Sequence, residues 1–244
     1  MLDEKEFVKN LTRVFSDNGL SGLLSHEKSL LFSRLADRLI TENEKYNLTA
    51  ICEPNKIILH HFLDSAVLAP RVPAGAAVAD IGCGAGFPSL PLAILRPDVR
   101  ITAIDSTAKR VNYVNETARL LGLTNITAVA MRAEDGAKAP EYRERYDVVT
   151  ARAVAELRVL SELTLGYARL GGKFIAMKGK NAEFELSAAK RAIAVMGGKL
   201  RGCEAITLVG DGEEISHPLI IIDKKTKTPE GYPRPYAKIS KKPL

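Results

Sequence analysis

Asp80-Ile81-Gly82-Cys83-Gly84-Ala85-Gly86-Phe87 is the stretch of sequence that decides the fold. It follows a short apolar run at residues 76–81 and precedes the apolar segment Leu90–Leu95, which we expect to be helical. Glycines at a strand–helix junction allow positive φ angles and let backbone N–H groups approach a ligand closely. The stretch therefore predicts a ligand-binding turn at a helix N-terminus, and a tight turn without a ligand is the weaker interpretation.

The segments around this turn alternate between strand and helix patterns. Further strands are predicted at residues 100–104, 125–131, 146–150, 173–177, 205–209 and 218–223. Helices are predicted at residues 109–121 and 183–196, each followed by glycine. This alternation predicts an α/β fold with a doubly wound, mostly parallel sheet of seven strands, in which a closing hairpin supplies one antiparallel strand.

The two ends of the chain have different patterns from the middle. In residues 1–70 apolar side chains recur at helical spacing, and Ser25 and Pro54 stand where helices can begin. We predict an N-terminal helical cap over residues 1–70, packed on a sheet domain over residues 71–223. Residues 224–244 contain four prolines, and we predict a basic tail without regular structure.

Composition narrows the class of protein. The 244 residues are 46% hydrophobic and 26% charged, which suits one α/β domain with a small addition. No run of 18 apolar residues occurs and the first residues are highly charged, so we expect a cytoplasmic protein with no membrane partner. The three cysteines are scattered, with no histidine at ligand spacing, and predict no metal site.

The net charge of +6 is concentrated near the end of the chain. Residues 223–244 contain 7 Lys/Arg and 2 Asp/Glu, whereas the rest of the chain has a net charge of only +1. Such a segment favours a polyanion such as RNA over a membrane, because no amphipathic apolar face accompanies it. The alternative is a solvated end that only keeps the protein soluble.

The glycine spacing separates two classes of nucleotide-binding loop. A dinucleotide fingerprint needs glycine at relative positions one, three and six, whereas this loop has glycine at one, three and five and Phe87 at six. The bulky ring would crowd a pyrophosphate, which argues against an NAD or FAD enzyme. The D-x-G-x-G-x-G form resembles the loop of class I S-adenosylmethionine methyltransferases.

Acidic residues after the next two predicted strands support an adenosine-containing ligand. Asp105 lies 19 residues after Gly86, where an acceptor for ribose hydroxyls is expected, and the same residue could cap the following helix. Ala133-Glu134 follows the third strand, where we expect it to lie near the adenine. Ligands of such sheets bind at the carboxyl ends of the strands, which is where all these residues originate.

The segment after the fourth predicted strand argues against two kinds of base methylation. Enzymes that methylate exocyclic amines of DNA bases resemble one another in an Asn/Asp-Pro-Pro-aromatic motif at this point, and residues 147–154 lack it. Cytosine C5 enzymes need a nucleophilic cysteine beside proline, and the nearest cysteine, Cys203, has no such neighbour. We therefore expect no DNA substrate.

An ordered set of short segments resembles the RsmG family, also called glucose-inhibited division protein B. The matching segments are residues 46–50, 60–65, 80–88, 104–106 with 109–110, 132–134, 150–153, 178–179 and 232–234. This resemblance extends over nearly the whole chain. It implies a cytosolic class I methyltransferase that uses S-adenosylmethionine to methylate N7 of one guanosine in the 16S ribosomal RNA of the small subunit.

The resemblance also implies particular cofactor contacts. Those carried over from the family are Gly82, Phe87, Ala133, Glu134 and Arg152. The loop and strand-end arguments add Gly84 and Asp105. Arg152 could anchor the methionine carboxylate or the target nucleotide, and a salt bridge across the strand ends is its structural alternative.

No catalytic acid or base is predicted for this reaction. Guanine N7 has a free lone pair and no proton, so aligning N7 with the methyl carbon and the sulfur is the main requirement. Four cations are predicted to contact RNA phosphates, namely Lys109, Arg110, Lys178 and Arg234.

Three further expectations complete the sequence-based hypothesis. His60 and His61 lie four and three residues before Asp64, and we interpret them as structural rather than as metal ligands or catalysts. We expect a monomer. The alternative function is a non-catalytic sensor of an adenosine ligand, or an RNA-binding ribosome assembly factor, on the same fold.

Overall fold

The computed structural model describes residues 2–179 and 181–244. It begins with the N-terminal helical cap, whose elements are α1 (Glu4–Asp17), α2 (His26–Tyr46), α3 (Pro54–Ile57), a π-helical turn (Ile58–Leu63) and α4 (Asp64–Ala66). As predicted, the Ser25 hydroxyl accepts the Lys28 N–H at the start of α2, and Pro54 occupies the first turn of α3. Within these described residues, no helix has the length and apolar content needed to cross a bilayer.

Seven strands form one sheet in the order β3-β2-β1-β4-β5-β7-β6. Their bounds are β1 Ala77–Ile81, β2 Arg100–Asp105, β3 Ile126–Ala130, β4 Tyr146–Arg152, β5 Ala168–Met177, β6 Gly198–Gly210 and β7 Glu213–Lys224. Pairs from β3 to β5 are parallel, whereas β7 is antiparallel to both β5 and β6. The predicted doubly wound, mostly parallel sheet with one antiparallel strand is confirmed.

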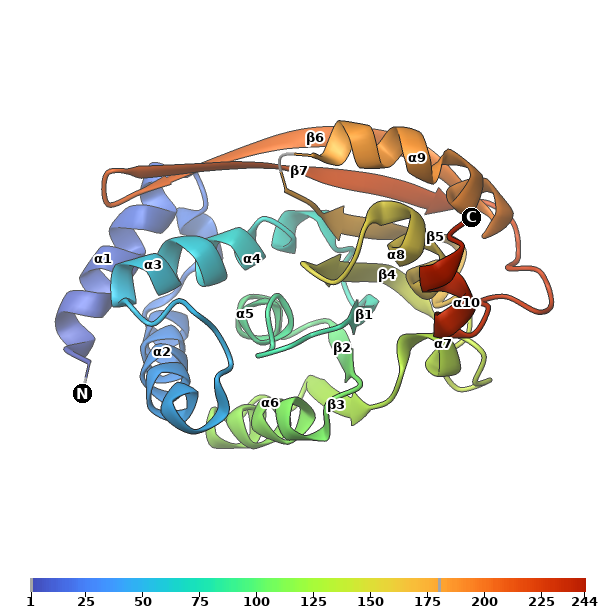
Figure 1. Cartoon of the computed structure of the whole chain (residues 1–244). Helices are drawn as coiled ribbons and strands as arrows, with labels where there is room; N and C mark the ends of the chain where they lie inside the picture. Colours follow the sequence, from blue (N-terminus) through green and yellow to red (C-terminus); the bar gives the residue numbers. More distant parts are fainter. Residues whose placement is uncertain (1, 180) are drawn as a thin grey trace.

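Helices cover both faces of the sheet (Figure 1). They are α5 Ser89–Leu95, α6 Ala108–Leu120, α7 Ala133–Gly136, α8 Leu157–Thr164, α9 Ala182–Val195 and α10 Tyr236–Lys241. Side chains alternate along each strand, so Val78 and Ile101 join the core under α5 and α6, while Ala79 and Ile104 join the core under α8 and α9.

The helical cap shares a hydrophobic core with one face of the sheet domain. The ring of Phe62 lies 4.8 Å from that of Phe32 in α2 and 6.2 Å from that of Phe87 in the glycine loop. All three rings are buried. Residues on both sides of the proposed division at residue 70 therefore share one core.

The β6–β7 hairpin is far longer than predicted. Its distal end lies beside α1 (Figure 1), where the Asn18 amide donates to the Val209 carbonyl at 2.7 Å and accepts the Val209 N–H at 2.9 Å. Most of β6 is exposed on both faces. The extra length consequently has no apolar alternation from which the sequence could reveal it.

The prediction that residues from 224 onward lack regular structure is wrong. Lys224 is the last residue of β7 and is fully buried, with its Nζ donating to the carbonyls of Leu165 at 2.8 Å and Met196 at 2.9 Å. Residues 236–241 form α10, which follows Pro235. The segment from residue 225 to Pro235 contains no helix or strand. Proline is well suited to the start of a helix, and α10 begins directly after Pro235.

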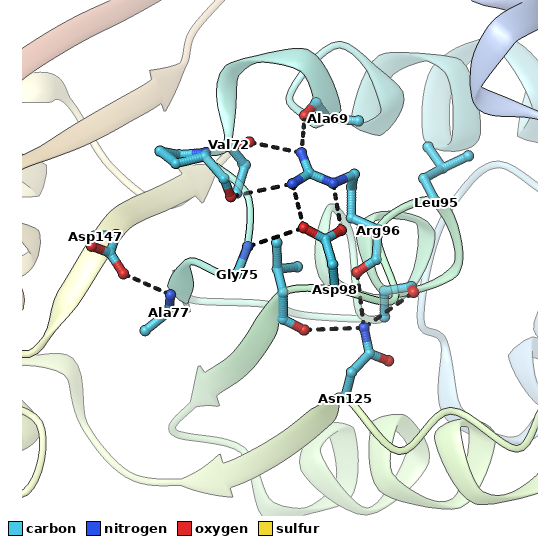
Figure 2. A network of polar contacts seen from close by, with 12 residues as sticks. Ala69, Val72, Gly75, Ala77, Leu95, Arg96, Asp98, Asn125 and Asp147 are labelled. Carbon is cyan, nitrogen blue, oxygen red and sulfur yellow. Dashed lines mark hydrogen bonds and ion pairs between the residues drawn. The ribbon is translucent and has the colours of Figure 1, made fainter.

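A closed polar network lies near the amino ends of the first strands (Figure 2). The Arg96 guanidinium makes two bonds of 2.7 Å to Asp98, and Asp98 also accepts the Gly75 N–H at 3.1 Å. Arg96 further donates to the carbonyls of Ala69, Val72 and Pro73. This network joins the end of the cap to the turn that precedes β1.

Candidate active site

The glycine loop after β1 is fixed by backbone bonds to the neighbouring strand. The N–H groups of Gly82 and Cys83 donate to the Ile104 carbonyl at 2.7 and 3.1 Å, and the Gly84 N–H donates to the Asp105 carboxylate at 3.0 Å. Gly82 has a φ of +75°, and a Cβ there would lie 2.6 Å from Val154. The loop thus needs glycine to pass close to the residues after β4.

Four of the seven predicted cofactor contacts line one cavity of about 340 Å³ at the carboxyl ends of β1, β2 and β3. They are Gly82, Asp105, Ala133 and Glu134. Ile104, Met131 and Leu163 supply apolar wall, and Arg110 reaches within 3.6 Å of Asp105. The volume lies within the range of small-molecule sites. Its one apolar side and its carboxylates suit a ligand with a flat ring system and hydroxyl groups.

Asp80, the acidic residue of the loop motif, is completely buried at the end of β1. Burial raises the pKa of Asp80 to about 6, against a hydrogen bond donated by the Ser89 hydroxyl of α5. Its second oxygen has no partner among the described residues. Cys83 is also buried, and burial raises the pKa of its thiol, which makes this cysteine a poor nucleophile.

Arg152 lines a second cavity of about 240 Å³ rather than the first one. Lys178 and His217 line it too, and Ala153 borders both cavities. The Arg152 guanidinium lies 2.7 Å from the Asp64 carboxylate and donates to the His60 carbonyl at 2.8 Å. This salt bridge joins the end of β4 to the cap rather than to another strand end, and it holds the guanidinium at a cavity wall.

Asp64 joins three parts of the chain at this second cavity. The residue begins α4 of the cap, Arg152 ends β4, and His217 in β7 places its Nε2 2.5 Å from the other carboxylate oxygen of Asp64. Burial works to raise the pKa of Asp64, but the His217 hydrogen bond and the Arg152 charge outweigh it and hold that pKa below its usual value. The carboxylate therefore stays charged and orients the Arg152 and His217 side chains.

The two histidines of the cap have structural partners, as interpreted from the sequence. His60 lies 3.1 Å from Glu213 of β7. The His61 ring stacks on Phe87 with centroids 4.4 Å apart, and its Nε2 lies 3.0 Å from the Thr49 hydroxyl. Burial, aided by the Arg152 charge, lowers the pKa of His61 to about 3, so the ring is neutral at pH 7.

The remaining predicted residues lie around these cavities in different ways. Phe87 is buried beneath the loop against His61, and Gly84 contacts the carboxylate of Asp105. Lys109 lies over the Tyr46 ring, with 4.6 Å between its Nζ and the ring centroid.

Besides Arg110, two of the predicted RNA-binding cations are paired with acidic residues. Lys178 lies 2.7 Å from Glu185. Arg234 makes bonds of 2.9 and 2.7 Å to Glu162, whose side chain is fully buried. These pairings give both cations a structural role, and their RNA contacts stay predictions.

Sequence reasoning missed Asp64 and His217 as parts of the second cavity, and Tyr236 as part of the first. Asp64 was noted only as a neighbour of the cap histidines. His217 and Tyr236 lie outside any recognisable motif. Their positions depend on the long hairpin and on α10, neither of which the sequence pattern revealed.

Comparison with known proteins gives this geometry a family. Residues 28–208 match the family model described as rRNA small subunit methyltransferase G. The chain belongs to this family. Ribosomal RNA small subunit methyltransferase G of Clostridium perfringens strain 13 is 44% identical over 222 residues, which are 90% of this chain and 92% of that protein. The protein of the same name from Desulfitobacterium hafniense is 42% identical over 243 residues, covering 99% and 98%. The resemblance found in the sequence is confirmed.

Solved structures confirm the fold class at low sequence identity. A transferase from Pyrococcus horikoshii superposes with a TM-score of 0.54 at 16% identity, covering 67% of this chain and 63% of that one. TYW2 of M. jannaschii, solved in complex with AdoMet, has a TM-score of 0.51 at 17% identity, covering 66% and 73%. The fold is that of the class I methyltransferases, as predicted.

Proposed function

We propose that this chain uses S-adenosylmethionine to methylate N7 of a guanine in 16S ribosomal RNA. Its family membership supports an S-adenosylmethionine-dependent rRNA methyltransferase, and it does not favour the non-catalytic sensor or assembly factor. The single observation that carries the proposal is that two cavities adjoin at the carboxyl edge of the sheet, with Ala153 in the lining of both. One cavity suits the cofactor and the other an acceptor base.

The first cavity fits the chemistry of S-adenosylmethionine. When bound, this cofactor supplies an electrophilic methyl group on a sulfonium centre. Asp105 offers a carboxylate to ribose hydroxyls, and Ile104, Met131 and Leu163 offer an apolar wall to the adenine. A Cβ on Gly84 would point into open space, so the backbone there is accessible to a ligand.

The second cavity has the cationic side chains of Arg152 and Lys178 in its lining. The His217 hydrogen bond and the Arg152 charge hold Asp64 as a carboxylate, and His61, beside Arg152, is neutral. Such a site cannot readily remove a proton, and guanine N7 has none to remove. Arg152 and Lys178 would hold the acceptor nucleotide, so catalysis would rest on proximity and orientation.

Binding of the RNA backbone is the least specific part of the proposal. Lys109 and Arg110 are exposed on the first turn of α6, beside the first cavity. Phosphate contacts need little beyond well-placed cations. We expect the enzyme to act in the cytoplasm, because its proposed substrate is ribosomal RNA. We also expect it to be a monomer.

Methyl transfer from labelled S-adenosylmethionine tests the proposal. Naked 16S rRNA and small subunits from a strain that lacks this protein would serve as substrates, followed by mass-spectrometric mapping of the product. One 7-methylguanosine is expected. Cofactor binding without transfer to either substrate would restore the sensor hypothesis, and tight NADH binding would contradict the interpretation of the loop.

A further inference from the structure

The C-terminal helix forms part of the wall of the first cavity. Tyr236, the first residue of α10, lines this cavity together with Ala133, Glu134 and Leu163. Its side chain is 43% exposed, so the ring is available to a ligand. Tyr236 therefore lies on the cavity wall, in the helix that packs near the segment after β3 and α8.

Two anchors fix α10 in this place. Ile239 is fully buried and forms a small hydrophobic cluster with Val159 and Leu163 of α8, with Ala133 packed against it. Just before the helix, Arg234 binds Glu162 of α8 through its backbone N–H at 2.8 Å and its guanidinium at 2.7 and 2.9 Å. In Figure 1, α10 lies beside α8 and α7, at the opposite end of the molecule from the N-terminus.

The preceding segment of the tail is also tied to the sheet domain. The Arg143 guanidinium donates to the carbonyls of Thr228 and Tyr232 at 2.8 and 2.9 Å. Together with buried Lys224, these bonds make the tail a packed part of the structure rather than a free arm. Arg234, whose partner Glu162 is fully buried, therefore contributes little free charge for RNA.

Part of the cavity lining is apolar. Ile104, Met131 and Leu163 present aliphatic side chains, and Tyr236 adds an aromatic ring. Aromatic side chains bind purine rings by stacking on either face, with little dependence on hydrogen bonding. A charged amino-acid end would find no comparable partner on these side chains.

We propose that Tyr236 is a binding residue for the purine end of the cofactor, so that the C-terminal helix completes the cofactor site. This inference rests on the proposed use of S-adenosylmethionine. It adds to the sequence-based expectation, which favoured RNA as the partner of the tail and kept a solvated end as the alternative. Removal of residues 235–244 would then weaken cofactor binding, whereas an RNA arm alone would leave that binding intact.

Calorimetry with matched variants tests this assignment. Tyr236→Ala should raise the dissociation constant of S-adenosylmethionine about tenfold, and that of 5′-methylthioadenosine by a similar factor, because both contain the purine. Tyr236→Phe keeps the ring and should bind within about twofold of wild type. Lys238→Ala, an exposed position on the same helix outside the cavity, should bind like wild type.

A second measurement tests whether the cofactor protects the C-terminal helix from proteolysis. Trypsin cleavage after Lys238 and Lys241 should slow when S-adenosylmethionine is added to wild type, and less so with Tyr236→Ala. Equal dissociation constants for Tyr236→Ala and wild type would overturn the assignment of Tyr236. Failure of wild type to bind S-adenosylmethionine would instead overturn the proposed function.

Discussion

Gly75 and Gly84 have nearly the same local structure at opposite edges of the sheet. Both have positive φ angles, of +67° and +56°, and a Cβ on either would meet nothing within 4 Å. Each donates its N–H to an aspartate, Gly75 to Asp98 at 3.1 Å and Gly84 to Asp105 at 3.0 Å. The glycine–aspartate unit alone therefore does not mark a binding site.

The two units differ in what surrounds the aspartate. At the amino edge, Arg96 occupies both oxygens of Asp98 and then satisfies three carbonyls, so the network is closed (Figure 2). At the carboxyl edge, Asp105 accepts the Thr107 N–H at 2.9 Å and borders an open cavity. Closed polar networks stabilise the fold, whereas polar groups facing a cavity can serve a ligand.

Removing Arg96 at the amino edge should give the largest effect. We expect this effect on stability and not on cofactor binding. Arg96→Ala leaves the Ala69 and Val72 carbonyls, both on buried residues, without these donors, which costs about 3 kcal/mol in the free energy of unfolding. Urea denaturation would measure the loss. The variant that remains folded should bind S-adenosylmethionine like wild type, and a weakened affinity would contradict the separation of the two edges.

Blocking the glycine of the carboxyl edge should, in contrast, weaken cofactor binding. Gly84→Val places a side chain in the open space at the loop and should weaken S-adenosylmethionine binding at least about a hundredfold, equivalent to about 2.7 kcal/mol. The strain of a β-branched residue at positive φ lowers stability as well. Calorimetry on the folded variant would measure the affinity.

Gly75→Val is the matched control for this substitution. It introduces the same side chain at a similar backbone conformation, again into open space. We expect a similar loss of stability with no change in cofactor affinity. If both variants lost affinity equally, strain rather than ligand contact would explain the effect of Gly84→Val.

The sequence predicted the carboxyl edge well where the signal is local. Glycine spacing and strand-end acids placed Gly82, Asp105, Ala133 and Glu134, which do line one cavity. Their meeting follows from parallel strands, whose carboxyl ends share one edge. Arg152 came from the family resemblance, and only the structure shows that it borders the neighbouring cavity.

Residues brought together from distant elements could not be predicted. His217 meets Asp64 only because the β6–β7 hairpin returns across the cap, and exposed strands leave no apolar alternation to detect. The helix α8 is not among the predicted elements, although Leu157, Leu160 and Leu163 recur in it at helical spacing. The fifth predicted strand begins only at residue 173, yet β5 already runs through Gly171 and Gly172, and a Cβ on Gly172 would lie 2.9 Å from the Tyr146 carbonyl oxygen.

Lowering the pH should also distinguish the two edges, through a smaller change in the free energy of unfolding. His61, with its pKa lowered to about 3, resists protonation in the folded state, whereas in the unfolded chain it takes up a proton below about pH 6.5. Its contribution to stability is therefore lost as pH falls from about 6.5 towards 3. Asp80, with its pKa raised to about 6, has the opposite sign over part of this range and masks the effect in wild type.

His61→Phe isolates the histidine, because the ring on Phe87 remains while the titrating group is removed. The free energy of unfolding of wild type minus that of the variant should fall by up to about 1.4 kcal/mol per pH unit between pH 6 and 4. Urea denaturation at each pH would measure it. The corresponding difference for Arg96→Ala should change much less, since Arg96 holds the pKa of Asp98 well below its usual range. A constant difference for His61→Phe would mean that the cap histidine is not kept neutral by the site.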